Sequence, residues 1–264
     1  IFNLSLPATQ TGDMYAMLLK LDEFGISTDH LIFNVRYASF LPRYEYEKAL
    51  FWWMDDLKVK DIEAYRRALP HDIYDNEEPI TTKSYKAFKS QVEDRILPQF
   101  HLYAYKDYLA QTITHAWDRQ LSFPIPDDSL APSAPWYEKE TKSYLEQDVI
   151  KRSFTDKPLD LSPKNTDIYF MNKIIEHQKS KKTFLVLTGT NQTLMKDFIE
   201  KPGYQDNLQK LDHYLASLPV GYLNLEGLIS DQLFTDHTHL MPEGYRELGR
   251  LVWHAYESQE ENNK

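Results

Sequence analysis

Three ionisable side chains lie close together near the C-terminus, in the stretch FTDHTHLMPEGY that spans residues 234–245. They are Asp236, His237 and His239. A carboxylate with two imidazoles suits a metal such as zinc or iron. The same groups also suit general acid/base catalysis, and in a polar turn they need have no chemical role. The residue types therefore leave three interpretations open.

A metal site would use all three side chains as ligands. Histidine ligands on one helix are typically spaced a turn apart, and that pattern is missing here. The remaining histidines offer no second cluster of ligands, because His177, His213 and His254 fall singly in segments that are expected to be helical. We therefore expect no metal and no other cofactor.

A catalytic acid/base pair requires only two of these residues, whereas the metal site would use all three. Asp236 can accept a hydrogen bond from Nδ1–H of His239, fix its tautomer and stabilise the imidazolium that forms when the ring takes a proton. The Asp-x-x-His spacing in a loop lets both side chains point to one place. The alternative is a cap on the following helix with a histidine on the surface, and the motif alone favours neither. His237 is expected to face solvent or to cap that helix.

The elements that would position this loop alternate between strands and helices. Residues 1–6 and 30–37 are apolar runs typical of buried strands, and residues 12–24 place apolar side chains at helical spacing. A strand, a helix and a strand at this spacing predict a βαβ unit with parallel strands.

The C-terminal part of the chain repeats this alternation. Strands are expected at 183–190 and 221–227, and helices at 166–178, 194–199, 204–218 and 242–256. The pattern predicts an α/β fold with a three-layer, doubly wound, mostly parallel sheet. Such folds bind ligands at the carboxyl ends of the strands, which is where the 235–239 loop would lie.

Residues 41–162 differ in composition from the rest of the chain. They hold most of the tryptophans, many tyrosines and Pro-rich stretches such as residues 123–136. We expect a large, mainly helical insertion within an α/β domain formed by residues 1–40 and 163–258. The polar residues 259–264 are expected to form a frayed tail.

Composition excludes several classes of function. The chain of 264 residues has no cysteine, so disulfides, Cys-based zinc sites and thiol catalysis are excluded. Its formal net charge of −10 argues against nucleic acid as a partner. No apolar run is long enough to span a bilayer, and no signal peptide is visible.

Several segments resemble blocks of the SGNH/GDSL hydrolase superfamily. Residues 234–252 (FTDHTHLMPEGYRELGRLV) are similar to its last block, where the Asp and His of a serine triad share a D-x-x-H loop. Residues 1–18 look like its second block, and residues 30–40 lie where its third strand is expected. Residues 184–198 (FLVLTGTNQTLMKDF) resemble a strand and loop of the cell-envelope branch, which includes D-alanine-transfer and alginate-acetylation proteins.

The resemblance implies an SGNH-like, flavodoxin-like fold and a serine esterase or O-acyltransferase that acts on an acylated envelope glycan or polymer. Asp236 and His239 would then be catalytic. The Gly-Asp-Ser-Leu-like turn of the family is missing, so we expect the nucleophilic serine upstream of Ile1, with Ser5 as the alternative. The chain would thus be truncated at its N-terminus, and inactive in this form if the serine is missing.

The resemblance also implies two oxyanion candidates, the backbone N–H of Ala8 and the side chain of Arg36. The family has an asparagine in its third block, whereas here Asn34 lies two residues too early and Arg36 or Tyr37 occupies the matching place. A guanidinium there would stabilise an oxyanion electrostatically or would be structural.

The envelope branch further implies export to the periplasm or cell surface, with room for an upstream anchor and a membrane-bound partner; the alternative is a cytoplasmic location. Two other functions stay open. One is a non-catalytic module that binds a glycan or a protein, and the other is a metal-dependent hydrolase that uses the 236–239 cluster.

Overall fold

The computed structural model describes residues 9–43, 49–50, 54–69 and 134–262. The chain divides into one compact unit of residues 1–72 and 132–264 and a second unit of residues 73–131. Every described residue belongs to the first unit. The strand expected at residues 1–6 lies outside the described residues.

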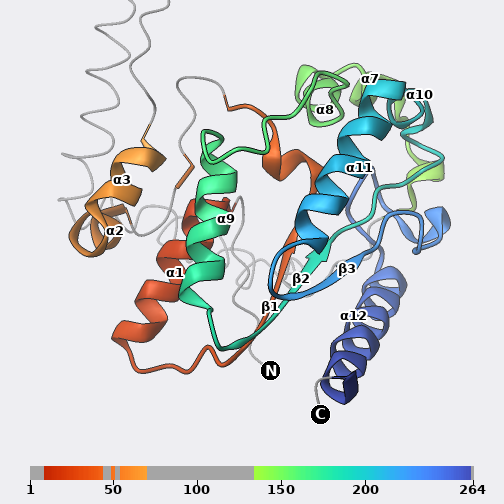
Figure 1. Cartoon of the computed structure of the whole chain (residues 1–264). Helices are drawn as coiled ribbons and strands as arrows, with labels where there is room; N and C mark the ends of the chain where they lie inside the picture. The colour runs from red at the N-terminus through yellow and green to blue at the C-terminus, as the bar shows by residue number, and fades with distance from the viewer. Residues whose placement is uncertain (1–8, 44–48, 51–53, 70–133, 263–264) are drawn as a thin grey trace, which may run out of the picture. The chain divides into compact units, whose positions relative to one another are not determined.

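Three parallel strands form a sheet in this unit (Figure 1). The strand β1 (His30–Val35) pairs with β2 (Lys182–Leu187), and β2 pairs with β3 (Gly221–Asn224). The mixed α/β class and the parallel strands expected from the sequence are confirmed. Each strand ends before its expected end, because the last expected residues turn away from the sheet as loops.

Side chains alternate between the two faces of the sheet along β2, and each face has its own hydrophobic core. Leu185 and Leu187 belong to one core, whereas Phe184 and Val186 belong to the other. Fully burying each of these side chains stabilises the fold by about 1.5–3 kcal/mol relative to leaving it exposed. An apolar run of this kind is typical of a strand that is covered on both faces.

Helices cover both faces of the sheet. The core around Leu185 receives side chains from α1 (Thr11–Glu23), α9 (Thr166–His177) and α11 (Pro202–Ala216). The core around Phe184 receives Val252 and Tyr256 from α12 (Pro242–Asn262). In Figure 1, α1 and α9 lie side by side. These four helices correspond to segments that the sequence predicts to be helical.

Shorter elements connect these parts. They are the helices α2 (Met54–Lys60), α3 (Ile62–Ala68), α7 (Lys142–Leu145), α8 (Asp148–Ser153) and α10 (Lys196–Ile199), and the 3-10 turns η1 (Tyr37–Phe40), η4 (Trp136–Glu138) and η5 (Asp231–Leu233). The helix expected at 194–199 is thus reduced to the single turn of α10. Among the described residues, no helix is both long enough and apolar enough to cross a membrane.

The amphipathic pattern of α1 is shifted from the expected one. The sequence places Met14, Met17, Leu18 and Leu21 at helical spacing. Leu18 is buried as expected, but the other three side chains are only half-buried. Tyr15 and Ala16 are buried instead, because α1 packs against α9 on one side and α2 on another. A helix with two packed sides buries a wider arc than a simple apolar stripe predicts.

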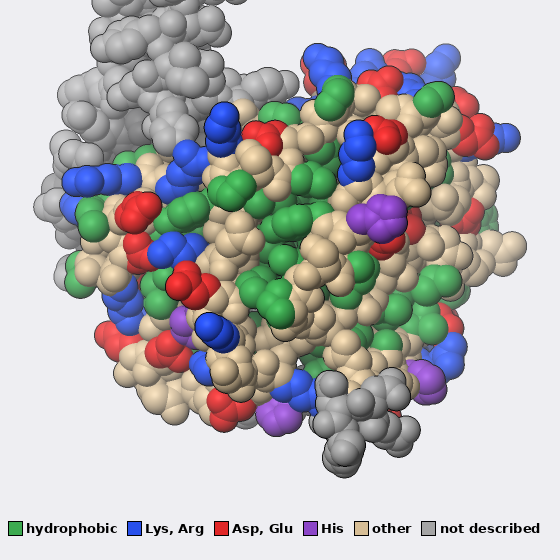
Figure 2. Space-filling model, viewed as in Figure 1, with side chains coloured by type: hydrophobic (Ala, Val, Ile, Leu, Met, Phe, Trp, Pro, Cys, Tyr) green, Lys and Arg blue, Asp and Glu red, His purple; other side chains and the backbone are tan. Residues whose placement is uncertain are grey.

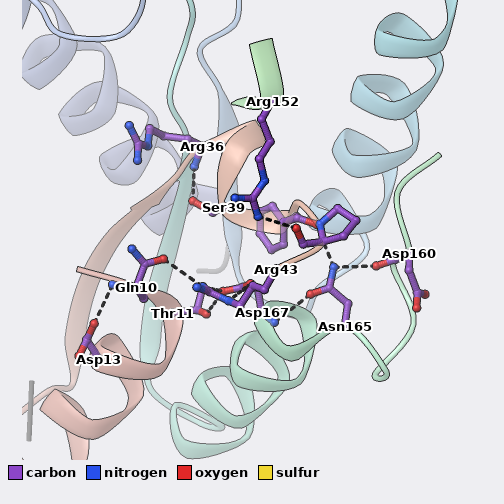
Figure 3. A network of polar contacts seen from close by, with 12 residues as sticks. Gln10, Thr11, Asp13, Arg36, Ser39, Arg43, Arg152, Asp160, Asn165 and Asp167 are labelled. Atoms are coloured by element: carbon purple, nitrogen blue, oxygen red, sulfur yellow. Dashed lines mark hydrogen bonds and ion pairs between the residues drawn. The ribbon is translucent and has the colours of Figure 1, made fainter. Parts of the chain in front are cut away.

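A buried ion pair fixes the start of α1 to the start of α9 (Figure 3). The guanidinium of Arg43 donates to Asp167 through Nε at 2.7 Å and through Nη2 at 2.5 Å. The hydroxyl of Thr11 donates to the same carboxylate, and Nη2 also donates to Oε1 of Gln10 at 3.0 Å. Asp167 is only 1% exposed, so its charge depends on these donors rather than on water.

The surface of the molecule shown in Figure 2 carries acidic and basic side chains interspersed with one another. Hydrophobic side chains gather in the middle of this face, over α9 and α11. This face therefore has no broad field of a single sign.

Candidate active site

The loop that carries Asp236 and His239 is closed on itself between η5 and α12. Phe234 and Leu240 form an isolated antiparallel bridge, and the N–H of Thr235 donates to the carbonyl oxygen of His239 at 2.8 Å. Gly244 lets the first turn of α12 approach the loop closely, because a Cβ there would lie 2.7 Å from the backbone oxygen of Leu233. The loop is therefore held at both ends.

Both oxygens of Asp236 are used. Oδ1 accepts from the backbone N–H groups of Thr238 at 2.9 Å and His239 at 2.8 Å, which bends the chain back toward the carboxylate. Oδ2 lies 2.7 Å from Nδ1 of the His239 ring. The Asp-x-x-His spacing is thus explained, because the turn built on Oδ1 brings the imidazole to Oδ2.

The protonation states of this pair follow from its environment. Burial alone would raise the pKa of Asp236, but the hydrogen bonds from His239 and Thr238 outweigh it and lower this pKa to about 2. The carboxylate can then only accept, so Nδ1 of His239 carries the proton and Nε2 is left with its lone pair. The hydrogen bond to Asp236 raises the pKa of His239, against the effect of burial. The side chain of His239 is 64% exposed, so its ring is accessible to a reactant.

His237 does not face solvent, so the first of the two roles expected for it is wrong. Its side chain is 12% exposed, its Nδ1 is hydrogen-bonded to the hydroxyl of Tyr144, and its ring contacts the edge of Phe154. Burial lowers the pKa of His237 to about 4, which keeps the ring neutral near pH 7. His237 is buried by tertiary contacts, because Tyr144 and Phe154 come from the α7–α8 region, which is far from it in the sequence.

The geometry does not favour a metal at this cluster. Asp236 and His239 are engaged with each other, and Nδ1 of His237 is engaged with Tyr144. Within the part of the chain that the structure describes, no group of three or more His, Asp or Glu side chains is placed to hold a metal ion.

A small pocket opens beside the pair, where β1 and β2 end. It is lined by Arg36, Tyr37, Ala38, Ser153, Phe154, Thr188, Thr190, His237 and Thr238. Arg36 and Tyr37 directly follow β1, and Thr188 directly follows β2. Since both strands are parallel, their carboxyl ends meet at one edge of the sheet, where doubly wound folds bind ligands.

The loop after β2 holds the 235–239 loop in place. The N–H of Asn191 donates to the carbonyl oxygen of His237 at 3.0 Å, and its side-chain amide donates to the carbonyl oxygen of Asp236 at 3.4 Å. Asp231 accepts from the backbone N–H groups of Gln192 at 2.8 Å and Thr193 at 2.9 Å. These contacts hold the loop after β2 and the 235–239 loop in a fixed position relative to each other.

Glu226 helps to hold the loop after β2, a role that the sequence analysis did not predict. Its carboxylate accepts from the N–H and the hydroxyl of Thr190, both at 3.1 Å, and from Nε2 of Gln192 at 3.0 Å. Burial raises the pKa of Glu226 to about 7, even though these hydrogen bonds favour the ionised form. An acidic residue just after an apolar strand is the signal that could have identified it, because it lies at the sheet edge that carries the site.

Residues 134–154, which belong to the expected insertion, pack against the site. Trp136 donates from Nε1 to the carbonyl oxygen of Asp231 at 2.9 Å, and Lys139 donates from Nζ to the carbonyl oxygen of Thr235 at 2.8 Å. This region also supplies Tyr144, the partner of His237. Sequence reasoning did not single out any of these residues as part of the site.

Of the sequence-predicted site residues, the structure brings Asp236, His239 and Arg36 into one region. Arg36 lines the pocket next to His237 and Thr238. Ser5 and Ala8 lie outside the described residues, so their roles stay predictions. Compared with protein-family models, with curated proteins and with solved structures, the chain gives no match.

Proposed function

We propose that the protein is a serine esterase or O-acyltransferase with an SGNH-type, flavodoxin-like fold, in which His239 is the general base and Asp236 orients it. The observation that carries this proposal is the 2.7 Å contact between Nδ1 of His239 and Oδ2 of Asp236, made by an imidazole whose ring is largely exposed. The position of the pair beside the carboxyl ends of parallel strands supports the same function.

In this mechanism, Nε2 of His239 takes the proton of a serine hydroxyl as its Oγ attacks the acyl carbonyl carbon of an ester. The tetrahedral intermediate carries its negative charge on the former carbonyl oxygen. Its collapse breaks the bond to the leaving alkoxide, which receives the proton from the imidazolium of His239, and leaves an acyl-serine. Asp236 stays ionised throughout and stabilises the transient imidazolium.

The second half of the reaction uses the same pair in the same way. Nε2 takes a proton from the acceptor, whose oxygen attacks the acyl-serine and releases the serine hydroxyl. Water as the acceptor makes the protein a hydrolase, and a sugar hydroxyl makes it a transferase. The substrate class in this proposal is an acylated envelope glycan or other polymer, with export of the protein to the periplasm or cell surface.

The nucleophile in this proposal is a serine that precedes Ile1, with Ser5 as the alternative. We expect a fluorophosphonate probe to label one serine of the natural full-length protein, because only a serine with an adjacent base reacts quickly with such reagents. Mass spectrometry of the digested adduct identifies the residue. An Asp236→Asn variant is expected to react more slowly, since its His239 loses the group that fixes its tautomer.

A control separates labelling at the site from labelling elsewhere. Asp206→Asn alters an exposed carboxylate of α11 that pairs with Lys210, and it should react at the wild-type rate. Adduct formation on several serines at equal rates in all three proteins would contradict the proposal. The same outcome would favour the non-catalytic binding module.

A further inference from the structure

Arg36 is an arginine at the pocket whose charge is not neutralised. It follows β1 on an extended backbone (φ −119°, ψ 160°), and its side chain is exposed at the pocket. Within the described residues, no carboxylate forms an ion pair with its guanidinium. Arg43, by contrast, is paired with Asp167, and Arg250 is paired with Glu247. In Figure 3 the side chain of Arg36 points away from the Arg43–Asp167 network.

The pocket contains no acidic side chain that could balance this charge. Its polar lining consists of hydroxyl groups and His237, and the hydroxyls of Thr188, Thr190 and Ser153 already donate to Val35, Glu226 and Val149. Guanidinium is therefore the main hydrogen-bond donor that the pocket offers to a ligand. A second cation, Lys139, is held on the adjacent loop through the carbonyl oxygen of Thr235.

The positive charge of Arg36 lowers the pKa of His239, the proposed general base. The hydrogen bond that Nδ1 of His239 donates to Asp236 is the main influence on the pKa of His239 and raises it, whereas the nearby charges of Arg36 and Lys139 lower it. A cation beside a base that must itself become cationic is unfavourable unless an anion lies between them. A negative group in the pocket would offset the charge of Arg36 and so favour the imidazolium of His239.

We propose that the Arg36 pocket binds a permanently anionic group of the substrate, a carboxylate or a phosphate carried beside the ester that reacts. The pocket is lined by His237 and Thr238 but not by Asp236 or His239, so its occupant lies next to the reacting ester rather than at its carbonyl oxygen. This role differs from the oxyanion role that the sequence resemblance implies for Arg36. Arg is suited to it, because its planar fork matches carboxylate and phosphate oxygens.

A binding experiment tests the inference without any activity. Inorganic phosphate is titrated into the protein while the ring C–H signals of His237 and His239 are followed by NMR. Saturable shifts are expected in the wild type and in the control Arg250→Gln, and binding about 10- to 100-fold weaker in Arg36→Gln. Equal binding in all three proteins, or no saturable shift in the wild type, would overturn the inference.

A kinetic experiment, which rests on the proposed function, locates the anionic group. p-Nitrophenyl hemisuccinate carries its charge on the acyl side, and 4-acetoxybenzoate carries it on the leaving group; each is compared with its neutral methyl ester. Arg36→Gln is expected to lower the charged-to-neutral ratio of kcat/KM by about 10- to 100-fold for one of the two pairs, mainly through KM. An equal loss of kcat for charged and neutral esters would assign Arg36 to the oxyanion and overturn the inference. These assays use the natural full-length protein, which includes the nucleophile. If it hydrolyses none of these esters, the proposed function fails, while phosphate binding still decides the inference.

Discussion

Replacing His239 by alanine is expected to lower kcat/KM for the hydrolysis of an activated acetate ester by roughly 10³- to 10⁴-fold. The variant has no group in place of Nε2 to take the proton of the serine, so the nucleophile stays a neutral hydroxyl. The loss should appear in kcat, because the imidazole acts on the transition state and the pocket that binds the ester stays intact. Steady-state kinetics with p-nitrophenyl acetate measure it.

His213→Ala is the matched control for this variant. His213 is an exposed histidine of α11, and its removal should leave the rate within about twofold of the wild type. The His239 side chain is itself 64% exposed, so His239→Ala should also unfold at nearly the wild-type temperature. An activity of His239→Ala within tenfold of the wild type, in a variant that is folded, would show that this imidazole is not the base.

Replacing Asp167 by alanine is expected to destabilise the fold by about 3–5 kcal/mol. The change leaves the guanidinium of Arg43 without its bidentate partner in a site where Asp167 is almost fully buried. It also removes the acceptor of the Thr11 hydroxyl at the start of α1. Urea denaturation followed by circular dichroism measures the loss.

Asp206→Ala provides the comparison for this second variant. The pair between Asp206 and Lys210 has the same charges, but its side chains are 57% and 59% exposed. Solvent screens such a pair, so its loss should be within the error of the measurement. Equal midpoints of denaturation for Asp167→Ala and Asp206→Ala would contradict the structural importance of the buried network.

The elements that the sequence predicted well are those whose signal is local. The apolar run that became β2 and the helical spacing that became α9 need no distant partner to be recognised. The contact between Asp236 and His239 is also local, because a single turn joins two residues that are three positions apart.

The features that the sequence did not predict depend on residues far apart in the chain. His237 is buried because Tyr144, 93 residues away, meets its ring. Arg43 pairs with Asp167, which is 124 residues away in the sequence. Glu226 accepts a hydrogen bond from Thr190, which is 36 residues away. Such contacts are set by how the elements pack, and periodicity in a single sequence carries no information about them.

The pKa of His239, measured by NMR in the wild type and in Asp236→Asn, is the most direct test of the proposed catalytic pair. The two residues form the proposed catalytic unit, and this measurement requires neither a substrate nor the nucleophile. We expect a pKa above the usual value of about 6.5 in the wild type and a lower pKa in Asp236→Asn, because the imidazolium loses its anionic hydrogen-bond partner. The same pKa in both proteins would contradict the coupling of Asp236 to His239, and with it the proposed general base.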